Sequence, residues 1–380
     1  MANLAIITGG DIRYFGGGEK YVLELANRLD DCDITIFSRV EKTNIRLNNK
    51  DLNNITKTKI RFYNSPNIPI LNTRIMLFSL SGLRVITELK KFDAVYSLDS
   101  TSINNVTLNF LSELYGFKYV FGIHDPSFFE NRPQKTLVNR IAFKLYRLVN
   151  RKIFFGIKNI HVLTDYYKNK LETEGYKGNI YLIPNFLYYK KSSIKAAKNE
   201  RRFIVLFGGR LAIYQKGIDL LVDIIKNVIN KNKEIEFQIF GSGEDGQGLI
   251  ETLSKQYRKN VKYLGFIPSI DMETRYKNSS LYIMTSRIEV FPTVVLEAQA
   301  HGLPVIAFNI NGLNNIIADF SGSTIKPFDV DAFANEILKY YNLWKEGKLD
   351  IKYKNGIIEH MFAAYSDEVI IPKIKKMFTN

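Results

Sequence analysis

An alternation of short apolar strands and amphipathic helices occurs twice along this chain, and it limits the fold more than any other feature of the sequence. In the first half, a strand at residues 4–8 leads through a glycine-rich loop into a helix. The helix is predicted from apolar residues at helical spacing: Val22, Leu25, Ala26 and Leu29. A second strand follows at residues 33–38. Such a strand–helix–strand unit predicts a mostly parallel sheet of the doubly wound type.

The alternation resumes after a polar, basic segment at residues 188–202, which we interpret as a linker. Because 380 residues are too many for one hydrophobic core, two domains are expected. The predicted class is α/β, with two Rossmann-like, doubly wound domains facing a central cleft. We expect an N-terminal domain at 1–187, a C-terminal domain at 203–360, and a helix at 361–380 that returns to the N-terminal domain. The other predicted elements are a helix at 217–229 and strands at 94–98, 119–123, 159–163, 203–207, 236–240, 282–285 and 304–308.

Composition excludes several classes of protein. The single Cys32 rules out a disulfide framework and a cysteine-based metal site, and the four histidines lie too far apart in sequence for a local metal motif. The N-terminus lacks the basic region of a signal peptide, and the longest uncharged stretch is interrupted by glycine and proline. We therefore predict a cytoplasmic protein, or one peripheral to the cytoplasmic face of a membrane.

The net charge of +15 favours an anionic partner, namely nucleotide phosphates, anionic lipid or nucleic acid. Residues 131–160 hold eight basic residues and no acidic one. Within this segment, four basic residues share one stripe of a predicted helix: Arg140, Lys144, Arg147 and Arg151. Apolar residues lie beside them, which is typical of a helix on a membrane surface, although a solvated face of a packed helix fits the same pattern.

Two short motifs are suited to bind phosphate. Gly16, Gly17 and Gly18 lie at a helix start, where small residues let the backbone approach a ligand and unbonded N–H groups favour an anion. Arg210 and Lys216 come from the loop after the first strand of the second half, and together they would form a cationic clamp for a pyrophosphate. Taken alone, the glycines also fit a tight turn, and the basic residues fit solvated surface charges.

The segment from Glu289 to Glu297 places two carboxylates eight positions apart. Glu289 is expected in a loop and Glu297 in a helix that begins near Pro292, since proline suits a first turn. The N–H groups of Thr293 and Val294 would then face a phosphate. Glu297 would accept hydroxyl protons from a ribose, and Glu289 from another polyol. Without context, both acids also fit exposed positions.

Polar residues elsewhere are less specific. His124 and Asp125 follow the strand at 119–123 and would face the expected cleft, although His124 alone fits a structural role equally well. Two Asp-x-Asp pairs, at 31/33 and 329/331, suggest a metal–nucleotide site. We reject both, because the first flanks a strand start and the second a helix start, where capping explains an aspartate.

The motifs in order are GGGE, His124-Asp125, GRL with KGIDLL, GSGE, and E-x7-E followed by EAQAHGLPVIA. This series resembles the family 4 glycosyltransferases of GT-B fold along most of the chain, most closely from residue 208 to 312. The resemblance implies that the chain transfers a sugar from a nucleotide sugar, by default a UDP sugar, with retention of anomeric configuration. It also implies that no metal and no cofactor are bound. The acceptor would be a glycan or a lipid-linked molecule.

The resemblance further implies a role for each motif. Arg210 and Lys216 would hold the donor diphosphate, Glu297 would bind the ribose, and Glu289 and His124 would contact the donor sugar. The four residues implied in catalysis are His124, Arg210, Lys216 and Glu289. The residues implied in donor binding are Gly17, Gly18, Arg210, Lys216, Gly241, Glu289, Phe291, Thr293, Val294 and Glu297. Val290 stands where many relatives have glycine.

Two other functions are consistent with parts of the sequence. A UDP-sugar epimerase has a similar two-domain build but needs acid and base carboxylates in its first domain. A nucleic-acid-binding protein would explain the charge, but the chain has no RNP, KH or zinc-finger signature and no aromatic–basic interleaving suited to base stacking. We therefore predict no nucleic-acid partner.

Overall fold

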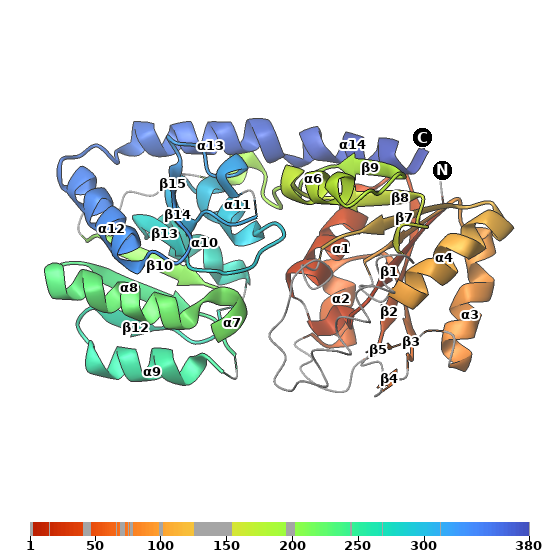
Figure 1. Cartoon of the computed structure of the whole chain (residues 1–380), viewed down its shortest axis with the longest axis horizontal. Coiled ribbons are helices and arrows are strands. Elements are labelled where there is room, and N and C mark those ends of the chain that lie inside the picture. The colour runs from red at the N-terminus through yellow and green to blue at the C-terminus, as the bar shows by residue number, and fades with distance from the viewer. Residues whose placement is uncertain are drawn as a thin grey trace. The chain divides into compact units, whose positions relative to one another are not determined.

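A computed structural model of the chain describes residues 3–14, 16–40, 47–65, 67–68, 73–74, 76, 79–98, 102–124, 154–194, 202–243, 245–267, 269–311 and 313–379. The chain divides into two compact units. The first comprises Met1–Asn185 with Ile370–Asn380, and the second comprises Phe186–Val369. Figure 1 labels most of the elements of both units.

The first unit is built on a seven-stranded parallel sheet with the order β3-β2-β1-β6-β7-β8-β9. Its strands are β1 Asn3–Thr8, β2 Asp33–Arg39, β3 Lys59–Tyr63, β6 Ala94–Ser97, β7 Lys118–Gly122, β8 Asn159–Val162 and β9 Asn179–Leu182. Its helices include α1 Gly17–Arg28, α2 Asn49–Ile55, α3 Leu80–Glu88, α4 Ser102–Tyr115 and α6 Asp165–Thr173. A short antiparallel ribbon joins β4 Asn67–Ile68 to β5 Thr73–Arg74.

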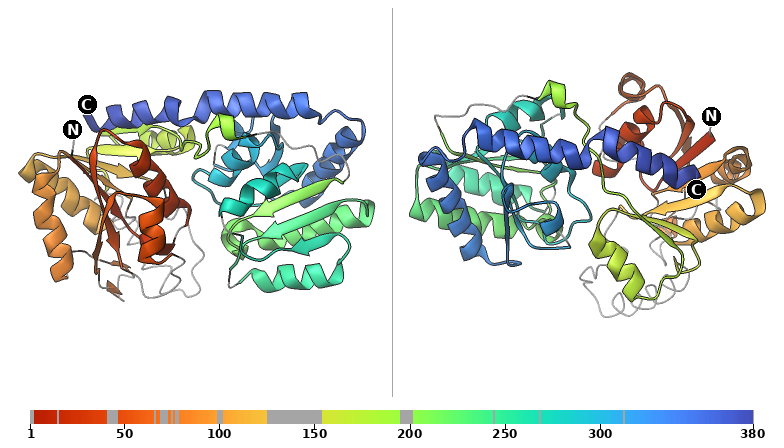
Figure 2. Two further views of the ribbon diagram at one scale, coloured as in Figure 1. Left: turned by 180° about the vertical axis from the view of Figure 1, so that it is seen from behind. Right: turned by 90° about the horizontal axis from the view of Figure 1, so that it is seen from above.

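The second unit contains a six-stranded parallel sheet with the order β12-β11-β10-β13-β14-β15. Its strands are β10 Ile204–Gly208, β11 Glu236–Phe240, β12 Val261–Tyr263, β13 Leu281–Met284, β14 Val305–Phe308 and β15 Gly322–Ile325. Its helices include α7 Ile213–Lys216, α8 Ile218–Lys231, α9 Gln247–Gln256, α10 Ser269–Lys277, α11 Thr293–Ala300, α12 Val330–Lys345 and α13 Ile351–Tyr365. Helix α8 lies in front of this sheet in Figure 1 and behind it in the reversed view of Figure 2, so it covers one face.

The central strands are buried, and this explains why they were predictable. Leu4, Ala5, Ile6 and Ile7 of β1 are each at most 1% exposed. Strands of parallel sheets that are covered on both faces read as continuous apolar runs. Every strand predicted from the sequence is present within one or two residues of its expected bounds.

The four strands that were not predicted in these sheets are the four edge strands, β3, β9, β12 and β15. Each contains partly exposed residues, so the continuous apolar run is lost. Edge strands of natural proteins commonly carry polar side chains, because these oppose pairing with another chain. The same polar side chains interrupt the apolar run by which the interior strands were predicted.

The C-terminal helix α14 Asp367–Thr379 contributes to the first unit from Ile370 onward. Its residues Ile370, Ile374 and Met377 are buried, at the spacing of one helix face. Nζ of Lys375 lies 2.8 Å from Oδ1 of Asp31, and the ring centroid of Phe378 lies 5.6 Å from that of Tyr96.

The unit boundaries differ from the expected domain bounds of 1–187 and 203–360. The second unit begins at Phe186, within a segment whose residues Phe186 and Leu187 are each 1% exposed. The backbone N–H of Leu187 donates to the carbonyl oxygen of Tyr365 at 2.8 Å, which ties the segment to the end of α13. The start of the expected linker therefore belongs to the second unit, and residues 195–201 lie outside the described chain.

Candidate active site

The candidate site residues follow strands at the position in each sheet where the order of the strands reverses. The chain builds the first sheet outward from β1 to β3 and then continues on the other side of β1 with β6, and the second sheet is divided in the same way between β10 and β13. Ligands of such sheets bind beyond the carboxyl ends of the strands at this point. The glycine loop follows β1, Arg210 and Lys216 follow β10, and Glu289 follows β13.

Two loops of the second unit pack backbone against backbone after β10 and β11. Gly209 and Gly241 have φ angles of 146° and 129°, a region that side chains rarely allow. A Cβ atom on Gly241 would lie 1.8 Å from the carbonyl oxygen of Gly209. The N–H of Leu211 also donates to the carbonyl oxygen of Ser242 at 2.9 Å. Gly241 therefore has a structural reason to be glycine, while its predicted contact with the donor stays a prediction.

Gly217 separates two helices where the sequence predicted the start of one. Its φ of 64° is left-handed, so α7 ends at Lys216 and α8 begins at Ile218. A Cβ atom on Gly217 would lie 2.2 Å from the carbonyl oxygen of Thr285. The Thr285 hydroxyl donates to the carbonyl oxygen of Lys216 at 2.9 Å. These contacts hold the loop that carries Lys216 against the end of β13.

Lys216 and Glu289 form an ion pair between Nζ and Oε1. The same carboxylate oxygen accepts a hydrogen bond from the Ser286 hydroxyl at 2.8 Å, and the Glu289 carbonyl oxygen accepts one from Nδ2 of Asn311 at 3.0 Å. Glu289 is only 7% exposed. The alternative that Glu289 is an exposed loop acid is therefore wrong.

Arg210 is exposed in the loop after β10, and its guanidinium donates to Oε1 of Gln215 in α7. Lys216 is the last residue of α7, so both basic residues lie between β10 and α8, although only Arg210 lies in a loop. Their joint contact with a diphosphate stays a prediction.

Arg287 was not predicted from the sequence, and its contacts hold α7 and α8 to the segment that carries Glu289. Its guanidinium donates to both carboxylate oxygens of Asp219, at 2.8 and 2.6 Å, and to the carbonyl oxygen of Ile213 at 2.9 Å. Hydrogen bonding within the pair raises the pKa of Arg287 and lowers that of Asp219. Because Arg287 lies two residues before Glu289, it connects the Glu289 loop to α7 and α8.

Glu297 lies in α11, which begins at Thr293 directly after Pro292, as predicted. It is 8% exposed, and its Oε2 accepts a hydrogen bond from the Tyr276 hydroxyl at 3.0 Å. Burial and the nearby carboxylate raise the pKa of Tyr276 well above its ordinary value, so Tyr276 remains a donor. Glu297 is therefore not the surface acid that the sequence also allowed.

The start of α11 carries the remaining predicted donor contacts of the second unit. Thr293 and Val294 are half-buried in its first turn, where N–H groups have no acceptor within the helix. Phe291 is 8% exposed, and its ring centroid lies 6.1 Å from that of Tyr365. Phe291 thus packs in the interior, and its contact with a donor stays a prediction.

In the first unit, α1 begins at Gly17, with Gly16 as the residue that precedes it. A Cβ atom on Gly17 or Gly18 would meet no atom within 4 Å, so the surface over this turn is open. Tyr21, in the next turn, contacts His124, with ring centroids 4.5 Å apart. The structure therefore brings His124 beside the glycine turn.

His124 belongs to a hydrogen-bonded group of aromatic residues. The Tyr96 hydroxyl lies 3.0 Å from Nε2 of His124 and 2.7 Å from Nδ1 of His161, and Nε2 of His161 lies 2.7 Å from the carbonyl oxygen of Ile183. Burial lowers the pKa of His161 to about 4 and that of His124 well below its ordinary value. Both imidazoles are therefore neutral near pH 7. No motif indicated Tyr96 or His161 as partners of His124.

Several predictions fall outside the residues that the structure describes. They concern Asp125 and the basic stripe of Arg140, Lys144, Arg147 and Arg151. The rejected aspartate pair at 329/331 behaves as expected, since the Asp329 side chain caps α12 by accepting from the N–H of Ala332 at 2.9 Å. Among the described helices, none combines the length and apolar character needed to cross a membrane.

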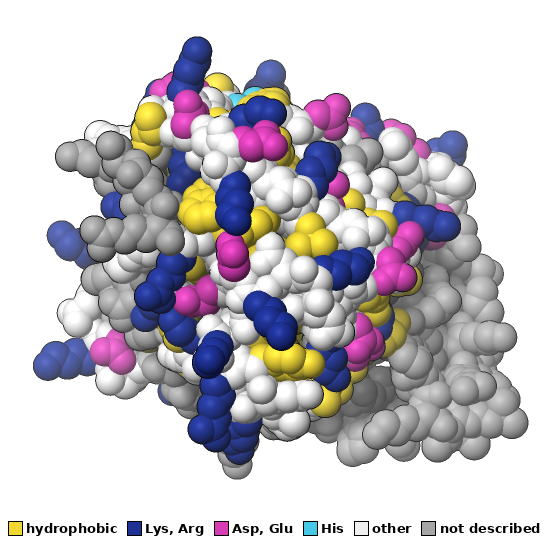
Figure 3. All heavy atoms as spheres, turned by 90° about the vertical axis from the view of Figure 1, so that its left-hand side faces the viewer, with side chains coloured by type: hydrophobic (Ala, Val, Ile, Leu, Met, Phe, Trp, Pro, Cys, Tyr) yellow, Lys and Arg dark blue, Asp and Glu magenta, His cyan; other side chains and the backbone are white. Residues whose placement is uncertain are grey.

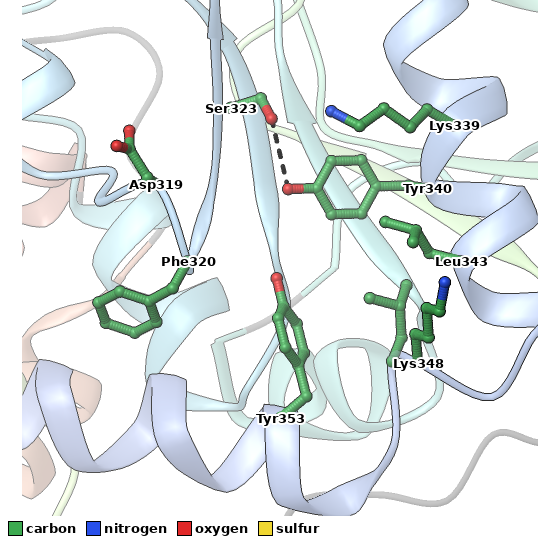
Figure 4. A pocket seen from close by; sticks show the side chains of 9 residues that line it. Asp319, Phe320, Ser323, Lys339, Tyr340, Leu343, Lys348 and Tyr353 are labelled. Atoms are coloured by element: carbon green, nitrogen blue, oxygen red, sulfur yellow. Dashed lines mark hydrogen bonds between the residues drawn. The ribbon is translucent and has the colours of Figure 1, made fainter.

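A cavity of about 260 Å³ lies among β15, α12 and α13, away from the predicted site residues. Tyr340 points there toward Ser323, with hydroxyl oxygens 3.4 Å apart (Figure 4). Ser323 also donates to Glu336 at 2.7 Å. Figure 3 shows basic side chains mixed with acidic and apolar ones on the face that it presents, rather than gathered into one patch. Neither feature adds a residue to the candidate site.

Comparison with known proteins supports a glycosyltransferase, the coarser part of the predicted family. Residues 189–355 match the model of the family Glycosyl transferases group 1. The chain is 32% identical over 144 residues to an uncharacterized glycosyltransferase of Methanocaldococcus jannaschii, with coverage of 37% of this chain and 36% of that protein. It is 33% identical over 177 residues to the amylovoran biosynthesis glycosyltransferase AmsD of Erwinia amylovora, with coverage of 44% and 49%. The matches thus span less than half of either relative.

The fold is shared with solved structures over the full length of the chain. HepE of Anabaena, crystallised in complex with UDP, has a TM-score of 0.76 at 16% identity, with coverage of 99% of both chains. The prediction of an α/β chain with two Rossmann-like domains is confirmed. The three comparisons together support a glycosyltransferase of the GT-B type, and the family match at residues 189–355 includes Arg210, Lys216, Glu289 and Glu297.

Proposed function

We propose that this protein is a retaining glycosyltransferase that moves a sugar from a UDP sugar to a hydroxyl group of a glycan or lipid-linked acceptor. The observation that supports this proposal most is the burial of two carboxylates in the second unit. Glu289 and Glu297 are 7% and 8% exposed, although ionised side chains are seldom buried unless they are paired or functional. Both lie in the segment after β13, where a parallel sheet binds ligands.

In the reaction, the bond between C1 of the sugar and the β-phosphate oxygen breaks, and its electron pair stays on the leaving UDP. The acceptor hydroxyl oxygen forms the new bond to C1, and its proton leaves with the phosphate or the solvent. Negative charge grows on the diphosphate, so nearby cations lower the barrier. Lys216 and Arg210 supply this charge from the loop after β10.

The arrangement around Lys216 suits such a role, because Glu289 pairs with the ammonium and the Thr285 hydroxyl holds the Lys216 backbone in place before the donor binds. Preorganised charge stabilises a transition state without further rearrangement. Glu297 is held in a comparable way, since Tyr276 occupies Oε2 and α11 fixes the backbone. We assign the Glu297 carboxylate to the ribose hydroxyls of the donor.

The choice of UDP is supported by HepE of Anabaena, which has been crystallised with UDP and with UDP-glucose. The assignment of a sugar-transfer reaction is supported by the family match and by the relatives described as glycosyltransferases. A UDP-sugar epimerase of similar build is the alternative that the test below separates from it.

The test is to incubate the full chain with UDP, GDP and ADP sugars, an acceptor panel and EDTA. We expect release of UDP together with a new glycoside whose anomeric configuration, read from proton couplings by NMR, matches that of the donor. An inverted product would overturn retention. Conversion of the UDP sugar into its epimer without net UDP release would support the epimerase, and loss of all turnover in EDTA would contradict the metal-free clamp.

A further inference from the structure

Tyr96, His124 and His161 form one hydrogen-bonded chain in the first unit, and the three residues come from or directly follow the neighbouring strands β6, β7 and β8. Tyr96 and His161 are both 0% exposed. Neither residue carries a role in the proposed sugar transfer, so their burial beside His124 requires its own explanation.

The donor and acceptor of each hydrogen bond in this group follow from the carbonyl oxygen of Ile183 at one end of it. A carbonyl oxygen can only accept, so Nε2 of His161 must carry the proton that it shares with Ile183. His161 is neutral, and therefore its Nδ1 is bare and accepts the proton of the Tyr96 hydroxyl. That hydroxyl has no second proton to give, so Nε2 of His124 must donate to the Tyr96 oxygen. In neutral His124 this leaves Nδ1 as a bare acceptor.

Packing keeps these three hydrogen-bonded side chains in this arrangement. A Cβ atom on Gly122 would lie 2.4 Å from the Tyr96 hydroxyl oxygen, so only glycine at this position of β7 allows the approach. Tyr21 of α1 packs against the His124 ring, with centroids 4.5 Å apart and planes at 41°. Among the described residues, Nδ1 of His124 has no hydrogen-bond partner, whereas Nε2 is fixed.

We propose that Tyr96 and His161 are positioning residues that hold His124 in its Nε2–H tautomer, so that Nδ1 accepts a hydrogen bond from a hydroxyl group of the donor sugar. The consequence for substrate binding rests on the proposed function. The tautomer itself does not, because it follows from contacts within the protein. In functional histidines, the hydrogen bond made by one ring nitrogen commonly fixes the tautomer and so decides the state of the other nitrogen.

The first test is nitrogen-15 NMR of the full chain labelled at histidine, which has only four such residues to assign. At pH 7 we expect His124 and His161 to show protonated Nε2 and bare Nδ1. His301 provides an internal contrast, since its Nδ1 lies 2.7 Å from the carbonyl oxygen of Glu297 and must carry the proton instead. A doubly protonated His124, or one with the proton on Nδ1, would overturn the proposal.

The second test compares Tyr96→Phe with Tyr176→Phe. Tyr176 is a matched control, because its hydroxyl also makes a buried hydrogen bond in the first unit, to the carbonyl oxygen of Ile157 at 2.7 Å. In Tyr96→Phe we expect the His124 signals to average between tautomers and KM for the UDP sugar to rise roughly 2- to 10-fold, while Kd for UDP, which lacks the sugar, stays unchanged. Tyr176→Phe should change neither quantity.

The outcomes separate this inference from the proposed function. An unchanged His124 tautomer in folded Tyr96→Phe would show that Tyr96 does not position the ring. An equal loss of affinity for UDP and for UDP sugar would place the effect away from the sugar. If the protein turns over no nucleotide sugar, the proposed function fails. The tautomers measured in the wild-type protein still decide whether Tyr96 and His161 hold His124 as proposed.

Discussion

Nζ of Lys216 pairs with Oε1 of Glu289 across 73 positions of sequence. The pair connects the loop after β10 with the loop after β13, and these two strands are neighbours at the point where the second sheet changes direction. Lys216 retains 18% side-chain exposure, whereas the Glu289 side chain retains 9%. The lysine can therefore meet a bound anion while the carboxylate behind it holds it in place.

Removal of either partner should destabilise the protein, because a charge is then left in a poorly solvated position. We expect Lys216→Ala and Glu289→Ala each to lower the free energy of unfolding by about 1–3 kcal/mol, and the double variant to lose less than their sum. Urea denaturation of all four proteins measures the coupling. Strictly additive losses would mean that the two charges do not interact in solution.

Glu297→Gln should weaken donor binding, because the amide retains an acceptor for Tyr276 but loses the negative charge that accepts the ribose hydroxyls. We expect the affinity for UDP to fall by about 1–3 kcal/mol in isothermal titration calorimetry. Glu236→Gln is the matched control, since Glu236 is also 7% exposed in the second unit but lies at the amino end of β11. Equal affinity in the wild type and Glu297→Gln would remove Glu297 from the ribose site.

Arg210→Ala and Lys216→Ala should each lower kcat by on the order of 10²-fold, since they stabilise charge that develops on the leaving group. Arg202→Ala is a control at the other end of β10, where Arg202 retains 68% side-chain exposure and contacts Glu236. Turnover should persist in EDTA for the wild type. Restoration of the variants by added Mg²⁺, or a strict need for Mg²⁺ or Mn²⁺, would argue against a clamp made of these side chains.

Acid should destabilise the protein partly through His161. Its pKa of about 4 in the folded state lies below the ordinary value of 6.5, so the unfolded chain binds more protons between these values and stability falls as the pH falls. We expect a contribution of about 2 kcal/mol to be lost between pH 7.5 and 5.

The measurement is urea denaturation at both pH values for the wild type, His161→Gln and His360→Gln. His161→Gln should show a smaller loss between the two pH values. His360 is exposed on α13, outside the hydrogen-bonded group of His161, and its variant controls for the loss of a histidine. The same dependence in all three proteins would contradict the burial of a neutral His161.

The basic stripe predicted at residues 140–151 should recruit the protein to anionic vesicles, because each basic residue near such a surface contributes about 1 kcal/mol. Sedimentation should weaken as salt rises, and it should not occur with zwitterionic vesicles. Replacement by serine of the four stripe residues, Arg140, Lys144, Arg147 and Arg151, should abolish it and leave UDP binding intact.

A charge-matched control replaces four exposed basic residues of the second unit by serine: Lys231, Lys255, Arg258 and Lys259. This control should still sediment with anionic vesicles. If both quadruple variants lose binding equally, net charge rather than the stripe is responsible, and if the stripe variant still binds, the acceptor is not selected through this segment.

The sequence by itself determined the interior strands of both sheets and indicated the residues of the candidate site. Interior strands such as β1 and β10 are apolar along their whole length because both faces are covered, and that pattern is local. Likewise, the start of α11 at Thr293 depends on residues within a few positions, because Pro292 directly precedes it. The motif order located Arg210, Lys216, Glu289 and Glu297 because each motif is short and its residue types suit phosphate or hydroxyl groups.

Only the tertiary structure decided how these residues are paired. Glu289 contacts Lys216 from 73 positions away, Arg287 contacts Asp219 from 68, and Tyr96 reaches His124 and His161 from 28 and 65. No local periodicity records such separations, because they arise from the order in which the strands are laid down in the sheet. The burial of the two glutamates, the ammonium held by one of them and the tautomer of His124 all follow from that order.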